Sequence, residues 1–252
     1  MNVRRIPQSE SSALKLMEHE IAKAVIVSDL HIGLPQFRRL EFLDLIASLN
    51  PDTALVLNGD TIDRPGNPLS AQDQQIVDFI RNQSYQRTVI WLSGNHADEY
   101  PGTDTGRIST RRHLQFGNRL LVMHGDDFDD VKPRAYWFLV GFSHFHKYLV
   151  RLGAPPVHVA EFAKRWLPFL YRVLTKKVRT KAVQYAKKHH VAAIACGHTH
   201  SVEDSHCDGV RYINTGSWTE FPLCHILVSE DTIELIRNNN EGRSATHDLA
   251  KA

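Results

Sequence analysis

The fold of this chain is decided by Ala24-Val25-Ile26-Val27-Ser28-Asp29-Leu30-His31, where a short apolar run leads directly into a carboxylate and an imidazole. The run is continuous and rich in β-branched residues, which is typical of a strand buried on both faces. In α/β sheets, binding sites gather at the carboxyl ends of such strands. We therefore expect Asp29 and His31 to be functional residues.

Four later segments repeat this pattern of an apolar run that ends in residues able to bind a metal ion. Segments with helical spacing, for example Phe37–Leu49 and Ser70–Gln83, lie between the early runs, and this alternation predicts an α/β fold. The four segments are Ala54–Leu57 before Asn58-Gly59-Asp60, Thr88–Leu92 before Ser93-Gly94-Asn95-His96, Leu120–Met123 before His124-Gly125-Asp126, and Val191–Ala195 before Gly197-His198-Thr199-His200.

The length of 252 residues suits one large domain that carries an insertion. We expect a single domain over residues 1–252, with a helical cap inserted at residues 127–190, where aromatic and leucine residues approach helical spacing. The alternative is that these helices only pack on the core. Beyond the insertion, the sequence predicts further strands of an antiparallel or mixed sheet and a flexible tail at residues 238–252. These strands are Arg211–Asn214, Cys224–Val228 and Thr232–Ile236.

Charge is distributed unevenly, although the net charge is only +2. Residues 131–190 contain thirteen Lys or Arg and a single acid, Glu161. Such a segment suits an anionic partner, and the alternative is a solvated helical face. The three cysteines have no CxxC spacing, and neither a signal peptide nor an apolar run of about 18 residues is visible. We expect a cytoplasmic protein, with peripheral contact at the inner face of the membrane as a further hypothesis.

The residues that end the five apolar runs are carboxylates, imidazoles and one carboxamide. This mixture of oxygen and nitrogen donors suits Mn²⁺, Fe²⁺ or Zn²⁺ better than Ca²⁺. Each motif occurs often by chance when it stands alone. Five of them in order, each after an apolar run, indicate a metal site at the carboxyl edge of the strands.

Taken together, Asp29-x-His31, Gly59-Asp60-x-x-Asp63, Gly94-Asn95-His96, His124-Gly125 and Gly197-His198-Thr199-His200 resemble the five signature blocks of the calcineurin-like metallophosphoesterase superfamily. The resemblance implies a four-layer α/β/β/α sandwich and hydrolysis of a phosphoester or pyrophosphate bond by a hydroxide that bridges two metal ions, with Mn²⁺ expected first. It also implies a role for each matching residue. Asp29, His31 and His200 would hold one ion; Asn95, His124 and His198 would hold the other; and Asp60 would bridge the two.

The resemblance gives two further residues a catalytic role. His96 would contact the phosphate or protonate the leaving group, and Asp63 would orient the ring of His96. The alternative for Asp63 is a loop carboxylate that caps a helix. Glycines 59, 94, 125 and 197 flank the ligands at turns where a side chain would intrude, which fits the same pattern.

The helical insertion and the segment Asn214–Glu220 resemble the branch of this superfamily that contains UDP-2,3-diacylglucosamine diphosphatase. In that branch the cap holds acyl chains and helps to contact the membrane, so a UDP-2,3-diacylglucosamine-like or related lipid or nucleotide substrate is implied. Basic residues of the cap are candidates for binding substrate phosphates. They are Arg134, Lys164, Arg165 and Arg172.

One departure from that branch concerns the third motif. The diphosphatases have Gly-Asn-Arg-Asp there, whereas this chain has Gly94-Asn95-His96-Ala97-Asp98, which is the general form of the superfamily. The difference leaves the metal ligands intact and leaves the substrate open. The alternatives are a nuclease or a phosphoprotein phosphatase of the same superfamily, and finally a non-catalytic scaffold. The intact ligand set argues against a scaffold, and the aromatics embedded in apolar helical faces argue against nucleic acid.

Overall fold

The computed structural model describes residues 21–63, 68–95, 104–129 and 159–239. Its helices are α2 (Arg39–Ser48), α3 (Ala71–Gln83), the short 3₁₀ helix η1 (Asp126–Phe128), α5 (Val159–Trp166) and α6 (Pro168–Lys188). Its strands are β1 (Ala24–Val27), β2 (Ala54–Asn58), β3 (Val89–Leu92), β4 (Ser109–Arg111), β5 (His113–Phe116), β6 (Leu120–Met123), β7 (Ala193–Cys196), β8 (Glu203–Cys207), β9 (Val210–Asn214), β10 (Leu223–Val228) and β11 (Ile233–Asn238).

The strands form two sheets, with the orders β11-β10-β1-β2-β3-β4 and β5-β6-β7-β9-β8. In the first sheet β1 to β4 are parallel, while β10 pairs antiparallel with β1. In the second sheet β6, β7 and β9 are parallel, and β5 and β8 run antiparallel at the edges. The carboxyl ends of the central strands therefore meet at one edge of each sheet.

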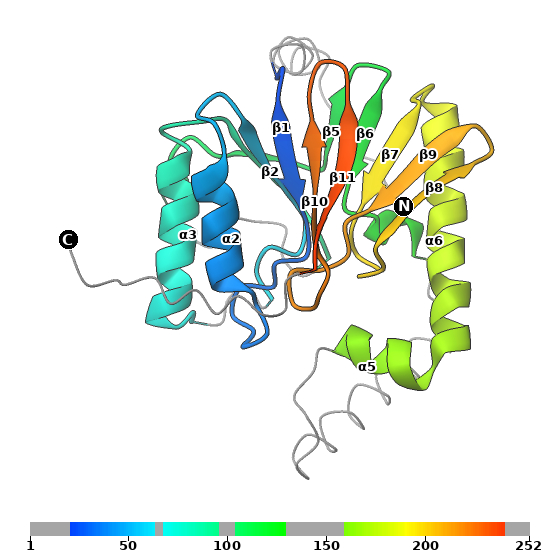
Figure 1. Ribbon diagram of the computed structural model, residues 1–252, viewed down its shortest axis with the longest axis horizontal. Coiled ribbons are helices and arrows are strands. Elements are labelled where there is room, and N and C mark those ends of the chain that lie inside the picture. The colour runs from blue at the N-terminus through cyan, green and yellow to red at the C-terminus, as the bar shows by residue number, and fades with distance from the viewer. Residues whose placement is uncertain (1–20, 64–67, 96–103, 130–158, 240–252) are drawn as a thin grey trace, which may run out of the picture.

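Four layers result, because the two sheets pack face to face and helices cover their outer faces (Figure 1). Side chains alternate along each strand: Ile26 of β1 lies between the sheets, while Val25 packs towards α2 and α3. In the second sheet, Val122 faces the first sheet and Leu121 packs with Ala182 of α6. Because the central strands are buried on both faces, they read as continuous apolar runs. The predicted α/β/β/α sandwich is confirmed.

Three strands were absent from the sequence prediction: β4, β5 and β8. Strand β8, Glu203-Asp204-Ser205-His206-Cys207, lies at a sheet edge and has no fully buried residue, so it lacks an apolar signal. Strand β4 consists of three polar or charged residues, two of them half-buried and one exposed, so it also lacks an apolar signal. The predicted strands of the last third exist, but they divide between the sheets, with β9 in the second and β10 and β11 in the first.

Helices α5 and α6 lie within the predicted insertion at residues 127–190. The second half of α6 packs on the outer face of the second sheet through buried residues such as Val178 and Val183. Near the junction of the two helices, by contrast, Trp166 is 64% exposed and Phe169 is 81% exposed. The alternative that the helices only pack on the core therefore describes one half of α6. Residues 130–158, which contain Arg134, and most of the predicted tail lie outside the described residues. That residues 127–190 form a separate cap stays a prediction.

Within the described ranges, no helix combines the length and the apolar character that crossing a membrane requires.

The N-cap of helix α3 allows a test of how local sequence stabilises the fold. Ser70 is its N-cap, and the Ser70 Oγ accepts a hydrogen bond of 3.1 Å from the backbone N–H of Asp73. We expect Ser70→Ala to lower the free energy of unfolding by about 1 kcal/mol, measured by urea denaturation, because one helical N–H loses its partner. Ser70→Asn restores a side-chain acceptor and should stay within a few tenths of a kcal/mol of the parent. Equal loss in both variants would contradict the capping role.

Candidate metal centre

Direct backbone contacts join the loops that follow the central strands. The N–H of Asp29 donates to the carbonyl of Gly59 at 3.1 Å, and the N–H of His31 donates to the carbonyl of Asp60 at 3.0 Å. In the second sheet, the N–H of Gly197 donates to the carbonyl of His124 at 2.9 Å. These bonds hold the ligand loops of β1 and β2 together, and those of β6 and β7.

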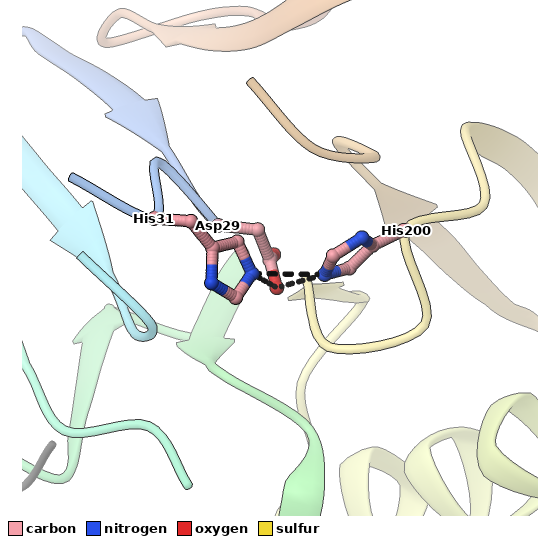
Figure 2. Close-up of side chains that lie close together, drawn as sticks. All are labelled: Asp29, His31 and His200. Atoms are coloured by element: carbon pink, nitrogen blue, oxygen red, sulfur yellow. Dashed lines mark hydrogen bonds and ion pairs between the residues drawn. The ribbon is translucent and has the colours of Figure 1, made fainter. Parts of the chain in front are cut away.

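The first group of candidate ligands consists of Asp29, His31 and His200, which point towards one another from both sheets (Figure 2). The Nε2 of His200 lies 3.1 Å from the Oδ1 of Asp29 and 3.1 Å from the Nε2 of His31. The Nε2 of His31 lies 4.0 Å from the same Asp29 oxygen. All three side chains are buried.

A second group consists of Asp60, His124 and His198. The Nε2 of His124 lies 3.3 Å from the Oδ2 of Asp60. The carboxamide oxygen of Asn95 lies 3.2 Å from the Nε2 of His124 and 2.9 Å from the Nδ1 of His198. The structure thus brings the seven predicted ligands together: the first group is the set that the resemblance implies, and Asp60, the predicted bridge, groups with His124 and His198. That they hold metal ions remains a proposal.

The backbone at these ligands adopts an unusual conformation. Positive φ angles occur at Asp29 (54°), His31 (50°), Asp60 (47°), His198 (61°) and His200 (52°). Only two other non-glycine residues of the described chain share this conformation. The left-handed region costs a non-glycine residue about 1 kcal/mol or more, and such residues concentrate at functional sites. The backbone therefore turns sharply at these five of the seven ligands.

Oxygen atoms of neighbouring residues lie close to three of the imidazoles. The Nδ1 of His124 lies 3.0 Å from the carbonyl oxygen of Asn58, and the Nδ1 of His31 lies 3.3 Å from the Oδ1 of Asp63. In His198 the other nitrogen is engaged, because its Nε2 lies 3.1 Å from the Oδ2 of Asp129. In His124 and His198, a ring proton shared with the Asn58 carbonyl or with Asp129 leaves the other ring nitrogen facing the centre, as in most metal-binding histidines.

Asp63 therefore contacts a candidate metal ligand, whereas the sequence prediction paired it with His96. His96 lies outside the described residues, so its predicted catalytic role remains a prediction. Asp129 was not predicted at all. The motif around it carries no spacing signal, and its contact with His198 arises only because η1 turns the chain back towards the centre.

Burial and mutual charge shift the proton affinities of the centre. Burial alone would raise the pKa of Asp29, but His124 and His200 hold it at about 2. Burial alone would lower the pKa of His124, but Asp29 and Asp60 raise it to about 9. For His200, burial dominates and lowers the pKa to about 4. The centre thus favours an ionised Asp29 surrounded by imidazoles, which is a suitable environment for divalent cations.

Two further features support the ligand loops, and the sequence did not predict this role for either of them. In the segment Asn214–Glu220, the Ser217 hydroxyl donates to the carbonyl of Asp29 at 3.1 Å, and the Asn214 carboxamide donates to the carbonyl of Gly197 at 2.6 Å. The segment thereby fastens the first and fifth ligand loops together. The sequence singled out this segment for its family resemblance and gave no signal of its contacts.

Arg112 is the second such feature, and sequence reasoning missed it. It lies between β4 and β5, and its guanidinium donates to Asp126 at 2.6 Å, to Asp127 at 2.8 Å and to the carbonyl of Ser93 at 3.3 Å. These bonds connect the loop of Asn95 with the loop of His124. A single arginine in a weakly apolar stretch offers no pattern from which this role could be inferred.

The predicted phosphate-binding residues lie in different environments. Lys164 forms an ion pair with Glu220 and also donates to the carbonyl of His200. Arg165 and Arg172 are exposed on α5 and α6. Their binding of substrate stays a prediction.

The two groups of oxygen and nitrogen donors, all buried except the half-buried His198, lie at the carboxyl ends of the strands and are candidate metal sites. The model of the calcineurin-like phosphoesterase family matches residues 22–202, and the chain belongs to this family. The match extends from the start of β1 through the fifth motif, so it includes every predicted metal ligand.

Similar proteins were found in both sequence and structure. The DNA polymerase II small subunit of Thermoplasma acidophilum is 25% identical over 240 residues, which cover 80% of this chain and 46% of that protein. This chain thus spans less than half the length of that relative. Among solved structures, the phosphoesterase Yfce from E. coli has a TM-score of 0.45 and 15% identity, covering 87% of this chain and 95% of that one. An archaeal phosphodiesterase has a TM-score of 0.41 and 13% identity, covering 85% and 99%.

Glycine at position 94 provides a test of the centre. A Cβ at this position would lie 2.2 Å from the Oδ1 of Asp60, an impossible approach. We expect Gly94→Ala to displace Asp60 and to weaken Mn²⁺ binding by at least about tenfold, measured by titration calorimetry on metal-stripped protein. A Cβ at Gly117 would meet no atom within 4 Å, so Gly117→Ala should keep the Mn²⁺ affinity, despite its positive φ of 52°. Unchanged affinity in Gly94→Ala would show that Asp60 is not a ligand.

Proposed function

We propose that this protein hydrolyses phosphoesters with two divalent metal ions held by the seven residues of the centre. The observation that carries the proposal is the division of buried donors into two groups, each with one carboxylate and two imidazoles. Donors of this kind fit Mn²⁺, with Fe²⁺ and Zn²⁺ as alternatives. Asp60 is suited to stand between the groups, because its charge acts on both Asp29 and His124.

The chemistry follows from what the residues can do. Two bound divalent ions would lower the pKa of a water molecule and neutralise charge on the phosphate oxygens. Asp129 and the carbonyl of Asn58 would keep His198 and His124 in the tautomer that presents a lone pair to the centre, and Asp63 lies 3.3 Å from the Nδ1 of His31. Asn95 is exposed, unlike Asp29 and Asp60, and so lies where substrate would enter. His96 follows Asn95 in the sequence, and its proposed role is to donate a proton to the leaving group.

For the substrate we propose a UDP-2,3-diacylglucosamine-like molecule or a related lipid or nucleotide. The support is the resemblance of the insertion and of Asn214–Glu220 to that branch, together with the exposed Trp166 and Phe169 beside Arg165 and Arg172. Apolar rings would accept acyl chains, and the guanidinium groups would bind phosphate. The compartment that we propose is the cytoplasm, with contact at the inner face of the membrane.

A second candidate function is a metal-dependent nuclease. It is favoured by the similarity to a DNA polymerase subunit and by the exposed lysines of α6, such as Lys176 and Lys177. A basic helix can follow a phosphate backbone, and binding of this kind weakens steeply as salt increases.

One assay separates these possibilities. Metal-stripped protein is reloaded with Mn²⁺ and offered a phosphomonoester chromogen, a phosphodiester chromogen, UDP-2,3-diacylglucosamine and DNA. We expect turnover that requires Mn²⁺, and a loss of at least about a hundredfold in Asp60→Ala, because the proposed bridging carboxylate is gone. The control Asp52→Ala removes an exposed carboxylate that pairs with Lys23, and should retain activity.

Each outcome of this assay has a distinct meaning. Release of UMP and a lipid monophosphate would support the diphosphatase-like substrate despite His96. Cleavage of DNA that falls steeply with salt would favour the nuclease. No Asp60-dependent turnover of any substrate by protein with confirmed metal loading would refute the phosphoesterase mechanism.

Membrane contact has its own test. We expect the protein to sediment with anionic phosphatidylglycerol vesicles and not with neutral phosphatidylcholine vesicles, with binding that decreases as salt increases. The double variant Trp166→Ser/Phe169→Ser removes the two most exposed aromatic rings of α5 and α6 and should reduce sedimentation severalfold. Retention of the parent protein in the supernatant with anionic vesicles would exclude this contact.

A further inference from the structure

Side chains of α5 and α6 contact the loop that carries His198 and His200. The hydroxyl of Tyr171 on α6 donates to the carbonyl of Thr199, and the ammonium of Lys164 on α5 donates to the carbonyl of His200. A third contact follows directly after the loop, where Arg179 forms an ion pair with Glu203. Two helices outside the sheet core therefore reach the backbone of a candidate metal-binding loop.

This loop needs such partners, because it belongs to no helix or strand. Buried carbonyl groups require hydrogen bonds, and the backbone of this loop supplies one of them, from the N–H of Thr199 to the carbonyl of Gly197. On one side, Asn214 donates to the carbonyl of Gly197. On the other side, the carbonyls of Thr199 and His200 receive their bonds from Tyr171 and Lys164. The positive φ of His200, 52°, adds to the need for external support.

The surroundings of Lys164 indicate a fixed rather than a mobile side chain. Its ammonium also pairs with Glu220 and lies 5.7 Å from the ring centre of Tyr171. The side chains of Lys164 and Glu220 are 27% and 15% exposed. Burial raises the pKa of Glu220, and the charge of Lys164 opposes that rise. Lys164 is therefore held between an acid, an aromatic ring and the ligand loop.

We infer that Lys164 and Tyr171 are positioning residues for the metal ligand His200, so that the helices α5 and α6 are part of the scaffold of the metal centre. This inference rests on the proposed metal binding. Loss of either residue would let the carbonyls of the loop seek water, and His200 would move away from Asp29 and His31. Supporting residues behind metal ligands contribute about ten- to a hundredfold to metal affinity. The ion at Asn95, His124 and His198 depends on other loops and would be affected less.

The test counts bound Mn²⁺ without using activity. Electron paramagnetic resonance of free Mn²⁺ gives the number and affinity of sites in the whole protein. We expect two sites in the parent, and in Tyr171→Phe one of them weakened by about ten- to a hundredfold. Lys164→Met is combined with Glu220→Gln, so that no half-buried carboxylate is left without its partner, and the same weakening is expected. Tyr85→Phe and Lys177→Met change an exposed tyrosine and an exposed lysine elsewhere, and should bind two ions as the parent does.

Pairing with ligand variants identifies which site is weakened. Added to His31→Ala, which removes a ligand of the first group, Tyr171→Phe should cause little further loss. Added to Asn95→Ala, which removes a ligand of the second group, it should weaken the remaining site. Circular dichroism of each variant confirms that the fold is retained, and Tyr171→Phe removes only one oxygen atom.

The outcomes separate this inference from the proposed function. Two sites of parental affinity in Tyr171→Phe would overturn the positioning role and leave the phosphoesterase proposal intact. Equal weakening of both sites, or the same loss in the control variants, would also overturn it. A parent protein that binds no Mn²⁺ would instead refute the metal centre itself.

Discussion

The whole centre depends on how closely the ligand loops of the two sheets approach one another. At Gly197, a Cβ would lie 2.2 Å from the Oδ2 of Asp29, so only glycine allows the fifth loop to lie against the first. The N–H of His198 then reaches the same carboxylate at 3.1 Å. Any larger residue would separate the two sheets at this edge. The sandwich architecture therefore serves to bring two sets of strand ends within bonding distance of each other.

This close approach of the loops is stable because side chains donate the hydrogen bonds that the loop carbonyls would otherwise accept from water. Three of the five ligand loops are bound by a side chain from another part of the chain: the loop of Asp29 by Ser217, the loop of Asn95 by Arg112, and the loop of His200 by Lys164. Close packing of the core between the sheets keeps these loops at a fixed spacing. Since the ligands adopt an unfavourable backbone conformation, the surrounding bonds must hold them there.

Sequence reasoning reached the strands and the ligands because both leave a local signature. A strand buried on both faces, such as Val25-Ile26-Val27, is a continuous apolar run, and the ligands follow it at once. It failed where the structural role depends on contacts across the fold. Edge strand β8 has no apolar face, and neither the contact of Asp129 with His198 nor that of Asp63 with His31 leaves a signal in the local sequence. Spacing predicts which residues end a strand, but not which side chain lies behind each ligand.

The charges of the centre, like its geometry, favour the binding of cations. Asp29 and Asp60 are buried carboxylates, and an isolated buried charge costs far more than the fold could offset. In the structure, the raised pKa of His124 allows it to carry a proton between them, while the lowered pKa of His200 keeps that ring neutral. A site that concentrates anionic and neutral donors in this way is completed by cations, and ions bound there would stabilise the folded state that presents it. The same side chains thus link the stability of the ligand loops to the chemistry of the family.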